Sequence, residues 1–519
     1  MSEFPFSSPS TGVFALSKPS HLFAAIALTA ALLIVRRLLK PDPYANYPQW
    51  GEELGGFAKR RTYYLHNAAE VYYDAYRKFK NRICKLTTLD GDILLLPIKY
   101  ADELLKLPGD IVDSYELLSS RIESKILKIK PENEYLVHVL RSDLNRQLPR
   151  LNDALADAAR TSVLETLGDS EQWTEFSVYR RVMEIVAVVS GSIFIGPELC
   201  RNKEWLEIGI RFTIDLFHAA TALKVYPRFL RPVAKYWCPE VFAVHRHTSK
   251  AAELLMPVIE NRRGLRDKDP SIVSNDLIHW LVNKAPKWGK DTTEFLVHSE
   301  LQLTMASLNN TTAAITHFLY DIAAKCPEVV PELRAEIQTA LDKHGGVWSA
   351  QALFSMKLLD SVMKESQRFN PNLMITPRKI LKPIEFRDGT RIPAGVNVCV
   401  AGYAALQDGD FYKDPATFDP YRFLKLRTGE TEDPLQYAST EQYQYVSVTK
   451  ENMIFGYGLH TCPGRFFASS AIKMICGQIL LQYDVKLPDG VTERYRNLIT
   501  GHFINPDTTK SLMIRKRVM

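Results

Sequence analysis

The chain has 519 residues, of which 46% are hydrophobic, 10% aromatic and 24% charged. This composition is typical of a globular protein with a large core, and it excludes a disordered chain, a collagen and a coiled coil. The net charge of +6 is spread along the chain without a lysine- or arginine-rich arm, which argues against nucleic-acid binding. At roughly 150 residues per domain, the length alone predicts about three domains.

The cysteines are odd in number, lie far apart and include no C-x-x-C pair. This pattern favours reduced thiols in a cytosol-facing protein over a disulfide framework or a structural zinc site. The seven positions are Cys84, Cys200, Cys238, Cys326, Cys399, Cys462 and Cys476.

The N-terminal region carries a candidate membrane anchor. Residues 19–35 have no formal charge when His21 is neutral, and Arg36, Arg37 and Lys40 follow at once. A helix over residues 19–35 spans about 25 Å, less than the roughly 30 Å of a hydrocarbon core. Snorkelling arginines and further leucines extend the apolar stripe.

Three interpretations compete for this segment: a cleaved signal peptide, a buried core helix and a retained anchor. The positive charges lie on its C-terminal flank and no small-residue cleavage site follows, so the sequence favours the anchor. We therefore expect residues 1–40 to be an N-terminal membrane anchor, with a transmembrane helix at about 19–39. Residues 41–50 are expected to be a stiff proline-rich linker.

Beyond the linker, the pattern predicts a mainly helical body with small β-sheets. Short β-rich stretches with Asp-Gly turns occur at 83–96 and 385–400. Between about 101 and 341, apolar residues recur at intervals of three and four, as in helices. The clearest helical segments are 151–167, 178–195, 251–263 and 296–324. Residues 424–452 are polar and turn-rich, and irregular segments of that length are uncommon unless they are functional.

The most informative segment is residues 455–465, in which Cys462 lies among glycines directly before a predicted helix at 466–481. Unpaired N–H groups at a helix N-terminus lower the pKa of a thiol, and glycines let the backbone approach a flat partner closely. The alternatives are a structural free cysteine and a dinucleotide-binding loop. The dinucleotide loop requires a glycine where Thr461 stands.

This segment fits F-x-x-G-x-x-x-C-x-G and so resembles the haem-binding signature of the cytochrome P450 superfamily of haem-thiolate monooxygenases. The resemblance runs from about residue 52 to the C-terminus, and it implies the cytochrome P450 fold as a single haem-binding catalytic domain over residues 51–519. It also implies haem b as the cofactor, with Cys462 as the axial ligand of the haem iron. The implied cofactor-binding residues of the loop are Phe455, Gly458, His460, Cys462 and Gly464.

Two further motifs of the family occur upstream in the expected order. Glu365 and Arg368 fit E-x-x-R, and Arg422 lies in a match to the second arginine motif, residues 418–423. Residues three apart share a helix face, so Glu365 and Arg368 can pair. By itself an E-x-x-R would be a surface ion pair that contributes little to stability. The resemblance instead implies a buried structural network that holds the cysteine loop.

The resemblance also implies residues that bind the haem propionates. Arg378 and Arg141 take this role by position, with a plain surface arginine as the alternative for each. Many members have an arginine where His460 stands, and a histidine there resembles fungal members and can still donate a hydrogen bond.

The helix predicted at 296–324 is implied to cross the distal haem face. The family pattern A/G-G-x-D/E-T-T meets Ala306-Ser307-Leu308-Asn309-Asn310-Thr311-Thr312, so Asn309 stands at the acid position and Asn310 at the alcohol position. Shifting the alignment by one residue would bring Thr311 to the alcohol position, but one residue corresponds to a rotation of about 100° around the helix. We take Asn309, Asn310 and Thr311 as atypical catalytic residues.

An amide has no accessible pKa, but it can hold water by donating and accepting hydrogen bonds. The two asparagines therefore leave two alternatives open: ordinary oxygen insertion with a water relay, or chemistry without net oxygen insertion. Candidate pocket-lining segments, apolar or small in character, are 115–122, 301–306 and 371–376.

The function implied is a monooxygenase that oxidises a lipophilic small molecule in a fungal-type secondary-metabolite pathway, for example a terpenoid, polyketide or indole alkaloid. The alternatives are oxidative coupling, ring formation or desaturation by the same cofactor, and a non-enzymatic haem- or lipid-binding membrane protein. Because the chain has no flavin or nicotinamide motif, O2 would be used with electrons from NADPH through a separate NADPH–cytochrome P450 reductase. Cytochrome b5 is a second candidate electron donor. We expect a single-pass protein of the endoplasmic reticulum membrane, in contact with membrane lipid, whose catalytic domain is cytosolic.

Overall fold

The computed structural model describes residues 28, 42–269 and 274–518. The chain divides into two compact units, residues 1–47 and 48–519. The anchor helix expected at about 19–39 lies, apart from Leu28, outside the described residues. Within the part of the chain that is described, no helix is both long and apolar enough to cross a membrane.

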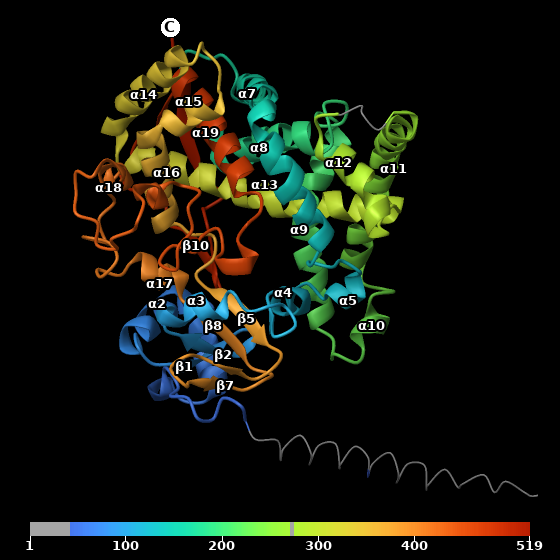
Figure 1. The fold of residues 1–519 in the computed structure, drawn as a ribbon, viewed down its shortest axis with the longest axis vertical. Helices are drawn as coiled ribbons and strands as arrows, with labels where there is room; N and C mark the ends of the chain where they lie inside the picture. The colour runs from blue at the N-terminus through green and yellow to red at the C-terminus, as the bar shows by residue number, and fades with distance from the viewer. Residues whose placement is uncertain (1–27, 29–41, 270–273, 519) are drawn as a thin grey trace, which may run out of the picture. The chain divides into compact units, whose positions relative to one another are not determined.

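The second unit is mainly helical with small sheets, as predicted (Figure 1). Helix α13 (Thr293–Ala324) runs through the middle of the helical part, and its buried residues lie on all sides, as expected for a helix enclosed by others. Its neighbours include α8, α9, α11, α16 and α19. The helices of this part are α6 (Glu134–Val139), α7 (Asn145–Leu167), α8 (Val178–Phe194), α9 (Lys203–Lys224), α11 (Pro239–Lys268), α12 (Leu277–Lys284), α14 (Val330–Lys343), α15 (Ala350–Ser355), α16 (Lys357–Phe369) and α19 (Arg465–Gln482).

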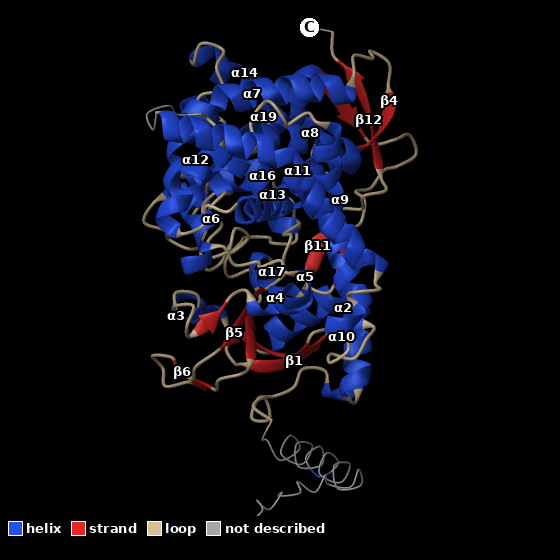
Figure 2. Ribbon diagram, turned by 90° about the vertical axis from the view of Figure 1, so that its right-hand side faces the viewer, coloured by secondary structure: helices blue, strands red, loops and turns tan. Residues whose placement is uncertain are grey.

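A five-stranded sheet forms a second, smaller part of the same unit (Figure 2). Its strand order is β1-β2-β8-β5-β3, with β2 and β8 parallel and the other neighbours antiparallel. Helix α2 packs on it, and backbone hydrogen bonds join Pro48 and Trp50 to Lys85 of β1. The elements of this part and the short helices near it are α2 (Phe57–Lys78), β1 (Cys84–Thr88), β2 (Gly91–Leu96), α3 (Ala101–Leu104), β3 (Val112–Asp113), α4 (Glu116–Arg121), α5 (Ser124–Leu127), β5 (Thr376–Ile380), β8 (Asn397–Val400) and α17 (Gly402–Leu406). Two further short helices contact the helical part: α10 (Arg231–Ala234) lies against α9, and α18 (Arg422–Thr428) lies against α16.

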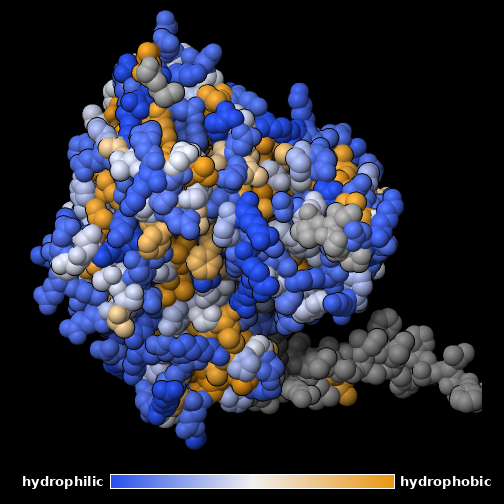
Figure 3. All heavy atoms as spheres, turned by 45° about the horizontal axis from the view of Figure 1, so that its top comes forward, coloured by the Kyte–Doolittle hydropathy of each residue, from blue (hydrophilic) through white to orange (hydrophobic). Residues whose placement is uncertain are grey.

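Three small sheets complete the fold of the described residues. They are the hairpin β6 (Ile384–Glu385) with β7 (Arg391–Ile392), the hairpin β10 (Leu498–Thr500) with β11 (Phe503–Asn505), and the sheet of β4 (Thr174–Ser177), β12 (Ser511–Lys516) and β9 (Tyr483–Lys486). On the face drawn in Figure 3, polar side chains predominate and apolar ones gather in the middle.

Most of the predicted elements are confirmed, and one needs correction. The hairpin at 83–96 is present, with Cys84 opposite Leu95. The stretch 385–400 also holds the predicted hairpin turn, between β6 and β7, and its last apolar run forms β8, which joins the main sheet. The helix predicted at 251–263 is the second half of α11, whose first half carries too many polar residues for the apolar pattern to show.

Candidate functional site

A cavity of about 630 Å³ lies between α13, the cysteine loop, α4, β5 and the β10–β11 hairpin. Its volume is in the range of small-molecule sites. Apolar side chains, among them leucines, phenylalanines and isoleucines, form the larger part of its surface, and the three segments predicted to line a pocket all contribute. The cavity also gathers predicted site residues from distant parts of the chain, namely Asn310, Thr311, Arg378, Phe455, His460, Cys462 and Gly464.

The cysteine loop is a tight backbone turn in front of α19. The N–H of Cys462 donates to the carbonyl of Phe455 at 2.7 Å and closes it. Gly458 has φ +69°, and a Cβ there would lie 2.2 Å from the carbonyl oxygen of Leu105, so only glycine fits. A Cβ on Gly464 would meet no protein atom within 4 Å although this residue lines the cavity, which leaves an open surface for a flat group beside the sulfur.

Burial raises the pKa of the Cys462 thiol. The N–H groups of Gly464 and Arg465 and the Arg465 guanidinium act in the opposite direction, as the position before a helix predicts, but burial is the larger effect. The expectation of a lowered pKa is therefore wrong for the protein alone. A sulfur that N–H groups face becomes a stable thiolate when a cation binds it directly, which fits a metal-bound thiolate at this half-buried position.

Arg378 on β5 is buried, with 6% of its surface exposed, and it lines the same cavity. Burial lowers the pKa of its guanidinium to about 10. It donates to the carbonyl of Pro377 at 2.8 Å and forms no ion pair with any described residue. A buried guanidinium without a protein counterion fits an anionic ligand such as a carboxylate.

His460 and Arg141 lie on the same side of the loop. Burial lowers the pKa of His460, with Arg378 and Arg141 contributing, and its ring packs edge-on against Tyr115 at 5.8 Å between centroids. Arg141 lies on a π-helical turn, Leu140–Leu144, where it is exposed and donates to the carbonyl of Leu459 at 3.0 Å. Arg141 thus supports the loop from outside the cavity, and direct contact with a propionate stays a prediction.

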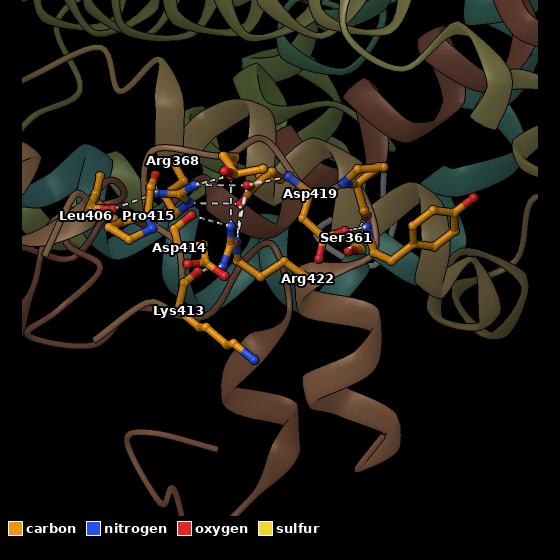
Figure 4. A network of polar contacts seen from close by, with 12 residues as sticks. Ser361, Arg368, Leu406, Lys413, Asp414, Pro415, Asp419 and Arg422 are labelled. Carbon is orange, nitrogen blue, oxygen red and sulfur yellow. Dashed lines mark hydrogen bonds and ion pairs between the residues drawn. The ribbon is translucent and has the colours of Figure 1, made fainter. Parts of the chain in front are cut away.

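The E-x-x-R motif forms a buried charge network with Arg422 (Figure 4). Glu365 accepts from Arg368 at 2.8 and 2.9 Å, from Nε of Arg422 at 3.2 Å and from the N–H of Asp419 at 3.0 Å. Glu365 and Arg368 are fully buried. The two guanidinia also bind backbone carbonyls and so fix the chain before α18, at Leu406, Lys413, Asp414, Pro415 and Thr417.

Helix α13 presents Asn309, Asn310 and Thr311 in different directions. Asn310 lies in the cavity, and Thr311 also lines it although only 7% of its surface is exposed. Asn309 does not line the cavity and faces α8 instead, where the hydroxyl of Tyr179 lies 3.5 Å from its Oδ1. This arrangement agrees with the register that puts Asn310 at the alcohol position.

Three polar residues of the cavity were not singled out by any motif: Arg121 and Asn372 lie within the segments 115–122 and 371–376 predicted to line a pocket, whereas His502 lies outside every predicted segment. A guanidinium N–H of Arg121 on α4 lies 3.1 Å from Nε2 of His502, which is in the turn between β10 and β11. Burial, together with Arg121, lowers the pKa of His502 to about 4, so the ring is neutral and accepts this hydrogen bond. Asn372, between α16 and β5, bonds to Asn310. No motif surrounds these residues, and only the fold brings them together.

A sequence model described as Cytochrome P450 matches residues 136–512. Cytochrome P450 monooxygenase braC of Annulohypoxylon truncatum is 34% identical over 95% of this chain and 98% of its own. Cytochrome P450 monooxygenase AN1598 of Emericella nidulans is 32% identical over 86% of this chain and 83% of its own. A solved structure, retinoic acid bound cyanobacterial CYP120A1, covers 87% of this chain and 95% of its own with a TM-score of 0.64 and 18% identity, which shows the fold alone.

The family model spans more than half of the chain, and the two curated relatives match this chain over 98% and 83% of their own lengths. Members of this family carry a haem-thiolate cofactor and use O2, a substrate and a redox partner. The chain therefore belongs to the cytochrome P450 family and is a monooxygenase, an oxidoreductase.

Proposed function

We propose that this monooxygenase holds haem b through Cys462 and oxidises a lipophilic small molecule in a fungal secondary-metabolite pathway. The observation that carries the proposal is the position of Cys462, whose sulfur lies at the start of α19 on a largely apolar cavity of about 630 Å³. Such walls suit a terpenoid, a polyketide or an indole alkaloid. The fungal relatives support this setting.

The protein residues have separable tasks in this proposal. Cys462 supplies the axial ligand, and the N–H groups of Gly464 and Arg465 stabilise the negative charge on its sulfur. Arg378 and His460 bind the propionates on the cavity side, while Arg141 supports the loop from outside. When bound, the haem supplies the activation of O2, and the apolar walls orient the substrate and exclude bulk water.

The first experiment tests whether Cys462 is the protein ligand of the haem iron. Reduced wild-type protein with carbon monoxide is expected to show the red-shifted Soret band of a haem thiolate, and Cys462→Ala should lose it. Cys476→Ala, which removes a buried cysteine of α19 outside the cavity, serves as the control and should keep the band. If the band persists in Cys462→Ala, the iron has another ligand and the proposal is wrong.

NADPH consumption separates the enzyme from a non-enzymatic haem- or lipid-binding protein. With NADPH–cytochrome P450 reductase and a substrate, the wild type should consume NADPH and Cys462→Ala should not. A protein that keeps the Soret band but never consumes NADPH would contradict turnover. Adding cytochrome b5 to the same assay tests whether it donates electrons.

A second candidate function is oxidative coupling, ring formation or desaturation without net oxygen insertion. It is favoured by the side chains on α13, because neither Asn309 nor Asn310 can give up a proton as an acid or alcohol does. Asn310 and Thr311 can instead hold water in the cavity. Labelled O2 separates the two functions: label in the product indicates insertion, and unlabelled product with label only in water indicates the second function.

We also propose that the protein is a single-pass protein of the endoplasmic reticulum membrane with a cytosolic catalytic domain. The apolar run at 19–39 and the positive residues after it support this location. Contact with membrane lipid is further supported by large apolar side chains that are half or more exposed near α10, namely Val225, Phe229, Val233, Tyr236 and Trp237. The full chain should remain in the microsomal pellet after alkaline carbonate extraction, and release into the supernatant would contradict an anchor.

A further inference from the structure

Two asparagine side chains meet inside the cavity, from segments 62 residues apart. Nδ2 of Asn372 donates to Oδ1 of Asn310 at 3.0 Å, and Nδ2 of Asn310 donates to the carbonyl of Ala306 at 2.9 Å. Because a backbone carbonyl only accepts, the contact with Ala306 fixes which atom of the Asn310 amide is the nitrogen. The amide of Asn310 is therefore held at both ends.

Asn372 is itself held by the hairpin that forms the opposite wall. Its carbonyl accepts from the N–H of Ile504 at 3.2 Å, and the N–H of Met374 donates to the carbonyl of His502 at 2.9 Å. Backbone bonds at and just after this residue thus fix the segment against β11. The pair of amides spans α13 and this segment and forms a rigid polar contact across the cavity.

Each amide nitrogen carries two hydrogens, and each uses one of them in the bonds described. One N–H of Asn310 and one of Asn372 consequently have no acceptor among the described residues, and both residues line the cavity. From the bond lengths of an amide, the two nitrogens are at most about 5.6 Å apart. This separation leaves room for one oxygen atom at about 2.9 Å from both nitrogens.

We propose that Asn372 is a positioning residue that fixes the amide of Asn310, and that the two amides together bind one oxygen atom in the cavity. That oxygen belongs either to a carbonyl or hydroxyl group of the substrate or to a water molecule. No charged side chain takes part in the contact, which suits a neutral oxygen better than an anionic one. The inference rests on the proposed function, because it places the bound oxygen in the cavity on which Cys462 lies.

The first arm of the test uses matched probes with the haem-loaded full chain. 2-Decalone and decalin share one skeleton, and their binding is followed by the change in Soret absorbance. Two hydrogen bonds should make the ketone bind about tenfold more tightly than the hydrocarbon in the wild type. Asn372→Leu should reduce that ratio to about one, and Asn505→Leu, another cavity asparagine that makes no bond to Asn310, should leave it unchanged.

The second arm is a crystal structure of the ligand-free, haem-loaded protein. If water is the occupant, an ordered water should lie within hydrogen-bond distance of Nδ2 of both Asn310 and Asn372, and it should be absent from Asn372→Leu. A ketone preference assigns the contact to the substrate, and a bridging water without that preference assigns it to water. If there is neither a ketone preference nor a bridging water, the proposal is overturned. The same holds if neither probe binds and no bridging water is found.

The carbon monoxide spectrum keeps this result separate from the proposed function. Asn372→Leu should retain the red-shifted Soret band, because Asn372 does not contact the cysteine loop through any hydrogen bond of the described residues. A normal band with no bound oxygen refutes only the amide pair. A wild type that lacks the band refutes the haem-thiolate site instead.

Discussion

Replacing Glu365 by glutamine keeps the shape of the side chain and removes its charge, and we expect a loss of about 3–5 kcal/mol in the free energy of unfolding. Glu365 is fully buried and is the carboxylate that faces both Arg368 and Arg422. Removing one partner of a buried ion pair costs about 3–5 kcal/mol, because the remaining charge stays buried. Domains commonly have a total stability of about 5–15 kcal/mol, so the loss is a large share.

The assay is urea unfolding of the haem-loaded protein, followed by circular dichroism and by the carbon monoxide band. Glu207→Gln is the matched control, because Glu207 pairs with Arg211 at 3.0 Å while 64% of each side chain is exposed. An exposed helix pair of this kind contributes about 0.5 kcal/mol or less. Equal shifts for the two variants would refute the reasoning, since they would mean that the backbone carbonyls alone satisfy the two buried guanidinia.

Two further predictions concern the loop and a buried lysine. Gly458→Ala should lower stability and haem content more than Gly429→Ala. Both glycines have a positive φ, which costs an alanine about 1–2 kcal/mol of folding free energy, but of the two only Gly458 would bring its Cβ against a backbone carbonyl. Equal urea midpoints and equal haem content for the two variants would contradict this expectation. Burial lowers the pKa of Lys364 to about 7, so the unfolded chain binds more protons than the folded one from about pH 7 to about pH 10. Lys364 therefore makes the wild-type unfolding free energy rise over that range, and Lys364→Met should rise less; parallel curves would show that the lysine titrates normally.

Local patterns predicted the parts of the site that depend on neighbours in sequence. The glycines before Cys462 and the three-residue spacing of Glu365 and Arg368 are such patterns, and the structure places both as expected. Burial is a property of the whole fold, which is why the direction of the Cys462 pKa was predicted wrongly. His502 was missed for a similar reason, since no motif marks a hairpin turn that lies far from α13 in the sequence, and Asn372 was predicted only as part of the pocket-lining segment 371–376.

The charge network and the cavity share almost no side chains. Glu365, Arg368 and Arg422 hold the chain before the cysteine loop, and none of the three lines the cavity. Substitutions on α4, at 372–376 or in the β10–β11 hairpin can therefore change what the cavity accepts without disturbing the support of the sulfur. Because the two are separate, related enzymes can acquire new substrates by changes in the cavity walls alone. The three segments are therefore the first targets for directed evolution of this enzyme.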